Sequence, residues 1–126
     1  MAHWSEKYIG MPYSEADCAE LAVRVQAEVF KRRINLPTER AEGIRQLSCQ
    51  ITNLQEDFAA PTYTPVEGDA VLMLSRGRIN HIGIYCVIDN VPHVLHAMRN
   101  AGSTCLHKLR ELKNIGLQLE GFYTWK

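Results

Sequence analysis

The residues best suited to covalent chemistry are one cysteine at the start of a helix and two histidines in later β segments. Cys18 follows Asp17 at the beginning of an amphipathic stretch. A thiol in the first turns of a helix lies near unpaired backbone amides and the positive end of the helix dipole, which favour the thiolate. Cys18 is therefore a candidate nucleophile. The alternative is a space-filling core residue, because free cysteines are among the most buried residue types.

Two histidine-bearing segments, 81–85 and 94–97, supply candidate partners for this thiol. His81 begins an alternating strand, and a neutral imidazole within hydrogen-bond reach of a thiol is the base that nucleophilic catalysis requires. Gly83 shares its strand face and leaves room for another backbone to approach, which a helix presenting Cys18 would use. The alternative is a structural histidine at a strand end.

His96 is the candidate for orienting His81, the task of the third group in a catalytic triad. A tight turn that pairs Ile88 with His93 would set the register of this hairpin. In that register Asn100 would lie opposite His81, which makes Asn100 a rival for the same task. Contact between His81 and His96 would need a longer loop or a bulge. His93 has the opposite parity, which predicts a surface position at the edge of the turn.

Four other polar side chains have simpler predicted positions. Tyr13 precedes the cysteine closely, so its hydroxyl can help to bind an oxyanion beside the backbone amide of Cys18, or its ring can pack at the helix entrance. Asp17 is predicted to be a capping carboxylate. His3 and His107 have no predicted partner and are expected in structural or solvent-facing positions.

Around these residues the sequence predicts helices first and an antiparallel sheet second. The expected helical segments run from a capping signal at 14–17 to about residue 33, over 38–48, and more loosely over 50–58. Pro61 and Pro65 mark a loop. The expected strands are 70–75, 81–88, 93–98, 104–107 and 119–125, with a short helical turn at 109–112. This order is typical of one α+β domain over residues 1–126.

Composition narrows the class of protein. The chain of 126 residues has 14 acidic and 14 basic side chains, so no large net charge directs it toward nucleic acid or an anionic membrane. The four cysteines, at 18, 49, 86 and 105, have no metal-type spacing. The start lacks the pattern of a signal peptide, and no apolar run approaches the roughly 20 residues of a membrane span. We therefore expect synthesis in the cytoplasm with free thiols and no membrane partner.

A series of short motifs follows one another along the chain. They are Tyr-Ile-Gly-Met-Pro-Tyr at 8–13, Asp-Cys at 17–18, Glu-Gly-Asp-Ala-Val at 67–71, His-Ile-Gly-Ile-Tyr at 81–85, Val-Leu-His-Ala at 94–97 and Gly-Phe-Tyr at 121–123. In this order they resemble the NlpC-type cell-wall cysteine peptidases, a bacterial and phage branch of the papain-like superfamily. The stretch 106–125 is similar to the compact versions associated with phage tails and prophages.

The resemblance implies a papain-like NlpC-type fold, with N-terminal helices packed on a C-terminal antiparallel sheet. It implies Cys18 as nucleophile, His81 as base and His96 as the orienting residue, and Tyr13 would match a family tyrosine near the oxyanion site. The activity it implies is hydrolysis of peptide bonds in peptidoglycan stem peptides, commonly between D-glutamate and a diamino acid, without a metal or organic cofactor. Here Ala19-Glu20 replaces the usual Ser-Gly after the cysteine, which changes the rim of the cleft.

The sequence therefore predicts a phage or prophage tail-associated peptidoglycan endopeptidase. Such a location would reconcile a missing signal peptide with a target in the cell wall, and it makes phage tail proteins expected partners beside the stem peptides. Two alternatives remain open. One is an amidase or acyltransferase on the same fold, and the other is a non-catalytic tail-assembly or wall-binding module.

Overall fold

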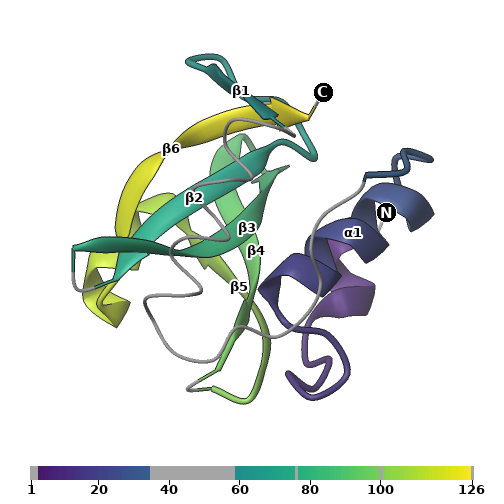
Figure 1. Ribbon diagram of the computed structural model, residues 1–126, viewed down its shortest axis with the longest axis horizontal. Helices are drawn as coiled ribbons and strands as arrows, with labels where there is room; N and C mark the ends of the chain where they lie inside the picture. Colours follow the sequence, from purple (N-terminus) through teal and green to yellow (C-terminus); the bar gives the residue numbers. More distant parts are fainter. Residues whose placement is uncertain (1–2, 35–58, 76, 100, 126) are drawn as a thin grey trace.

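The computed structural model of the chain describes residues 3–34, 59–75, 77–99 and 101–125. Its elements in chain order are η1 (Trp4–Tyr8), α1 (Cys18–Glu28), β1 (Ala59–Thr62), β2 (Ala70–Ser75), β3 (Arg78–Ile88), β4 (Val91–Met98), β5 (Ser103–Lys108), η2 (Leu109–Ile115) and β6 (Gln118–Trp125). The strands form one antiparallel sheet in the order β1-β6-β2-β3-β4-β5. Figure 1 shows α1 and the N-terminal segment on one side of this strongly bent sheet. The architecture is mixed α+β, as predicted.

The helix α1 begins later and ends earlier than the sequence suggested. Asp17 is the N-cap. Its carboxylate accepts a hydrogen bond from the backbone amide of Glu20 at 2.9 Å, and the Glu20 carboxylate accepts one from the backbone amide of Asp17 at 3.4 Å. This reciprocal pair is a capping box, which confirms the predicted capping role of Asp17, whereas the capping signal at 14–17 that began at Ser14 was one turn too early. The helix ends at Glu28 instead of residue 33 because the chain turns away at Lys31, which has a left-handed φ of 53°.

Both faces of the sheet are covered. Leu21 and Val25 of α1 are fully buried against one face, in a cluster that includes Ile84 of β3 and Leu95 of β4. Full burial of such side chains stabilises a fold by about 1.5–3 kcal/mol each. The opposite face carries Val71, Met73 and Val94, which pack with Leu112 of η2. The core therefore has two layers, and alternate residues of β3 and β4 belong to different layers.

The turn between β3 and β4 sets the register of the histidines. It consists of Asp89 and Asn90, which have φ values of 53° and 62°, and it pairs Ile88 with Val91. Two consecutive left-handed residues are what a two-residue hairpin turn of type I′ requires. The expected pairing of Ile88 with His93 was therefore wrong. With the tighter turn, each residue of β3 faces the β4 residue two positions earlier in the chain than the expected register would give.

Gly83 allows β3 and β4 to approach closely at this point. A Cβ atom there would lie 2.4 Å from Cγ2 of Val94 and 3.1 Å from the carbonyl oxygen of Leu95. We expected this space to be used by the helix that presents Cys18, and that expectation was wrong because the space is taken by β4. On the other side of β3, a bulge in the pairing with β2 falls immediately before His81.

Other predictions differ in outcome. The five predicted strands and the helical turn after β5 are present, within a few residues of the expected bounds. The strand β1 lies where a loop was expected around Pro61. Among the described strands it is an edge strand next to β6, a position that tolerates proline. The predicted helical segments 38–48 and 50–58 lie outside the described residues, as do Cys49 and Asn100. Within the described ranges, no helix is long and apolar enough to cross a bilayer.

Candidate active site

Three imidazoles form a hydrogen-bonded row across β3, β4 and β5. Nε2 of His81 lies 2.7 Å from Nδ1 of His96, and Nε2 of His96 lies 2.8 Å from Nδ1 of His107. The neighbouring rings are tilted by 69° and 60°, with centroids 5.0 Å apart in both pairs. His96 is completely buried and uses both ring nitrogens, whereas the two outer rings are partly exposed.

The sheet register places these side chains together. Continued beyond Ile84, the β3–β4 pairing sets His96 opposite Gly83, so His81 is its diagonal neighbour. In the β4–β5 pairing His96 lies opposite Cys105, and His107 is again diagonal to it. Diagonal neighbours on one sheet face are within reach of ring side chains. The predicted contact between His81 and His96 is confirmed, and it arises from a tighter turn instead of a longer loop.

Desolvation keeps two of the three rings neutral, the fully buried His96 and its partly exposed neighbour His81. Desolvation lowers the pKa of His81 to about 4. Desolvation, together with the positive charges that His81 and His107 would carry, lowers the pKa of His96 to about 2. At neutral pH each of these two rings therefore has one N–H and one lone pair.

Cys18 is the first residue of α1, and its thiol is held in an apolar environment. Only 5% of the residue is exposed, and it packs in a cluster with Ala22, Leu72 and Ile82. Desolvation, and then the negative charge of Asp17, raise the thiol pKa to about 11, while the backbone amides of Ile82, Ala19 and Cys18 itself act in the opposite direction. We expected an ionised sulfur, and that expectation was wrong because burial and the capping carboxylate outweigh the helix amides.

The thiol lies beside β3 at the level of the imidazole row, but on the other side of the strand. Its sulfur is near the amide of Ile82, the residue that follows His81. Alternation along β3 directs Ile82 toward α1 and His81, paired with Met73, toward the opposite layer. Among the described side chains, no hydrogen bond joins the Cys18 sulfur to a histidine ring, and none engages Nδ1 of His81. The structure therefore brings His81 and His96 together and places Cys18 next to them without direct contact.

Tyr13 lies between the helix start and the β4–β5 hairpin. Its backbone amide donates to the carbonyl oxygen of Gly102 at 2.9 Å, and its half-buried ring packs at the edge of the cluster around Leu21. This position agrees with the packing alternative. A role for its hydroxyl at an oxyanion site stays a prediction.

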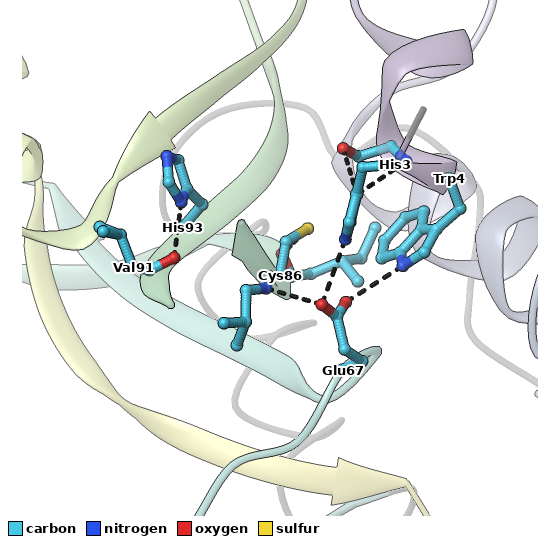
Figure 2. Close-up of polar contacts among 9 residues, drawn as sticks. His3, Trp4, Glu67, Cys86, Val91 and His93 are labelled. Carbon is cyan, nitrogen blue, oxygen red and sulfur yellow. Dashed lines mark hydrogen bonds and ion pairs between the residues drawn. The ribbon is translucent and has the colours of Figure 1, made fainter. Parts of the chain in front are cut away.

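The two remaining histidines have local structural partners (Figure 2). Nδ1 of His93 lies 2.8 Å from the carbonyl oxygen of Val91, so His93 takes no part in the row. Nε2 of His3 lies 3.1 Å from Glu67, whose carboxylate also accepts from the Trp4 indole at 3.0 Å and the Val87 amide at 2.8 Å. Glu67 thus fastens the N-terminal segment to β3. We expected no partner for His3, and this carboxylate supplies one.

His107 is the site residue that the sequence reasoning missed. It was expected to be structural or solvent-facing, because the β4–β5 register could not be set without knowing its turn. The available signal was its place in a predicted strand next to the one that carries His96. In the described part of the chain, no three histidine, cysteine or carboxylate side chains are arranged to hold a metal ion. The ring nitrogens of the row point at one another instead of converging on one point.

Comparisons of the chain with protein-family models, with curated proteins and with solved structures found no match.

Proposed function

We propose that this chain is a cysteine hydrolase of the NlpC type that cleaves peptide bonds in peptidoglycan stem peptides, as a single papain-like domain associated with a phage or prophage tail. The observation that supports this most is the hydrogen bond between His81 and His96. It engages Nε2 of His81 and leaves Nδ1 outside the row, so Nδ1 can accept a proton when Nε2 is the donor in that hydrogen bond. A second support is the thiol of Cys18 beside the peptide unit that joins His81 to Ile82.

In the proposed reaction, the sulfur of Cys18 attacks the carbonyl carbon of the scissile bond while its proton passes to Nδ1 of His81. The negative charge on the carbonyl oxygen is met by the backbone amide at the start of α1, with Tyr13 as a second donor. The C–N bond then breaks, and the leaving amine takes the proton from His81. Water attacks the resulting thioester with His81 again as base, which releases the carboxylic acid and restores the thiol.

The electrostatics favour a neutral thiol and a neutral imidazole before the substrate binds, since the two pKa values are about 11 and about 4. Proton transfer therefore accompanies attack, as general-base catalysis, instead of preceding it. In the structure the thiol and the ring of His81 lie on opposite sides of β3, so the proposed attack requires a movement of the start of α1 against β3 that brings the sulfur to Nδ1 of His81. Catalytic hydrogen bonds are often long in free enzymes and tighten in the substrate complex.

The test is digestion of purified muropeptides followed by mass spectrometry of the products. We expect stem-peptide cleavage by the wild type and by Cys86→Ala, a matched variant of another buried thiol that packs on the helix-facing side of β3, away from the imidazole row. We expect none with Cys18→Ala. Equal cleavage by Cys18→Ala would contradict the proposal. Transfer of the acyl group to an added amine, with no hydrolysis, would indicate the acyltransferase alternative.

One observation favours a second candidate, a tail-assembly or wall-binding module without turnover. The thiol is 5% exposed and its pKa is raised, as in a structural cysteine. This candidate predicts that the wild type and Cys18→Ala bind peptidoglycan sacculi equally and that neither releases peptides. Sedimentation with sacculi, combined with mass spectrometry of the supernatant, separates the two candidates.

A further inference from the structure

We propose that His107 is a positioning residue of this site, which acts through His96 to keep a lone pair on Nδ1 of His81. The proposal rests on the proposed function for its catalytic meaning, but its physical content concerns the protons of the imidazole row. It is carried by the two short contacts, 2.7 Å and 2.8 Å, that His96 makes with its two neighbours.

A row of neutral rings allows two proton arrangements. Because neutral His96 has one N–H, it must donate to one neighbour and accept from the other. In the first arrangement His81 donates from Nε2 to His96, and His96 donates from Nε2 to His107, so that Nδ1 of His81 keeps a lone pair. In the second arrangement His107 donates from Nδ1 to His96, and His96 donates from Nδ1 to Nε2 of His81, so that Nδ1 of His81 carries hydrogen. Only the first arrangement has a base on the open side of His81.

His107 selects between these arrangements because its Nδ1 accepts in the first and donates in the second. The carboxylate of Glu111, on η2, lies close enough to interact with His107. The Glu111 carboxylate accepts a hydrogen bond from the Lys108 amide at 2.7 Å, which is the main reason that its pKa is lowered. A positive charge on His107 would lower this pKa further. The bond to the Lys108 amide places this negative charge next to the His107 end of the row, and we expect it to favour hydrogen on the outer nitrogen of His107, which is the first arrangement.

An apolar residue at position 107 would remove this preference. His96 is fully buried, so in the first arrangement its Nε2–H would have no acceptor. A buried N–H without an acceptor is rarely tolerated, and an unpaired lone pair is tolerated more often. His107→Leu should therefore shift the row toward the second arrangement. Asparagine places a carbonyl oxygen near the position of Nδ1, so His107→Asn should keep the first.

The experiment is ¹⁵N NMR of histidine-labelled protein at pH 7.5, which distinguishes Nδ1–H from Nε2–H tautomers ring by ring. We expect Nε2–H at His81 and His96 in the wild type, in His107→Asn, and in the matched control His93→Asn, whose ring bonds to the Val91 carbonyl away from the row. We expect mainly Nδ1–H at His81 in His107→Leu. If His107→Leu fails to fold, the same measurement on His107→Ala replaces it.

A kinetic measurement accompanies the spectra. We expect kcat for muropeptide cleavage to fall about tenfold in His107→Leu, with KM changed less than twofold, and to recover in His107→Asn. An unchanged Nε2–H signal at His81 in His107→Leu, or an Nδ1–H signal in the wild type, would overturn the proposal. If the wild type cleaves no muropeptide but the tautomers shift as expected, the control by His107 stands and the hydrolase assignment fails.

Discussion

The imidazole row on β3, β4 and β5 is held by hydrogen bonds between side chains, whereas the thiol of Cys18 is held by packing among apolar side chains. Desolvation acts on both, and it lowers the pKa of the bases and raises that of the acid. The two halves are therefore neutral at rest for the same reason. The two halves differ in geometry. A hydrogen bond to His96 fixes the orientation of the His81 ring, whereas apolar packing does not direct the Cys18 sulfur toward that ring.

The largest expected effect comes from removing the base. In His81→Ala, kcat for muropeptide cleavage should fall by about 10²–10⁴, the usual contribution of a general base. Steady-state kinetics with purified muropeptides measures it, and His93→Ala should retain wild-type kcat because its ring bonds to Val91. Equal losses in both variants would mean that the hairpin was damaged and not the site.

The second effect concerns the thiol. Because its pKa is raised from 9.0 to about 11, the thiolate fraction of Cys18 near neutral pH should be about a hundred times smaller than that of an unperturbed thiol. We therefore expect slow iodoacetamide labelling of Cys18 at pH 7 that accelerates as the pH rises toward 11, with Cys105 labelled first. Peptide mass spectrometry follows the labelling of each cysteine. Fast labelling of Cys18 at pH 7 would contradict the raised pKa and support the thiolate that the sequence predicted.

The third effect tests the close approach of β3 and β4. In Gly83→Ala the new methyl group would overlap Val94 and crowd the Leu95 carbonyl, so the free energy of unfolding should fall by about 1–3 kcal/mol. Urea denaturation measures this loss. Gly121→Ala is the matched control, since its Cβ would meet only ordinary contact with Tyr123 at 3.6 Å. Similar losses in both variants would show that the position on β3 is not special.

A fourth expected effect is the pH dependence of stability. His81 and His96 have lowered pKa values in the folded protein, so the unfolded chain binds more protons below about pH 6.5. Stability should be constant above that pH and fall by about 1.4 kcal/mol per pH unit for each of these histidines as the pH drops toward 4. Urea titrations at pH 7, 6 and 5 measure the slope. In His81→Asn the slope of the unfolding free energy against pH should be smaller by about 1.4 kcal/mol per pH unit, because one titrating ring is lost. A slope equal to that of the wild type would argue against a neutral His81 in the folded protein.

Much of the fold could be predicted because local patterns determine it. The strands β2 to β6 follow from alternating side chains and turn residues, and the buried stripe of α1 follows from helical spacing. The start of α1 was misplaced because both Ser14 and Asp17 can cap a helix, and only the reciprocal bond with Glu20 decides between them. The strand β1 was missed because it is short, contains Pro61 and is defined by its partner β6.

The candidate site could be predicted only in part. His81 and His96 were identified correctly as neighbours, but the pairing that joins them depends on two left-handed residues at 89 and 90, neither of which is glycine. The position of His107 next to His96 depends on the register of the β4–β5 hairpin, which no single residue of the sequence reveals. The charge state of Cys18 was misjudged because helix position is visible in the sequence, whereas the apolar neighbours that surround the sulfur come from distant strands.

The carboxylate of Glu67 has a practical consequence for anyone who shortens or tags this chain. Its Oε1 contacts both Nε2 of His3 and the amide of Val87, and its Oε2 accepts a hydrogen bond from the Trp4 indole. Val87 lies six residues from His81 along the same strand. Trimming the first few residues would release the Glu67 carboxylate from two of its three partners and loosen the C-terminal end of β3. Truncated versions made for crystallisation or screening should keep the chain from residue 3 onward.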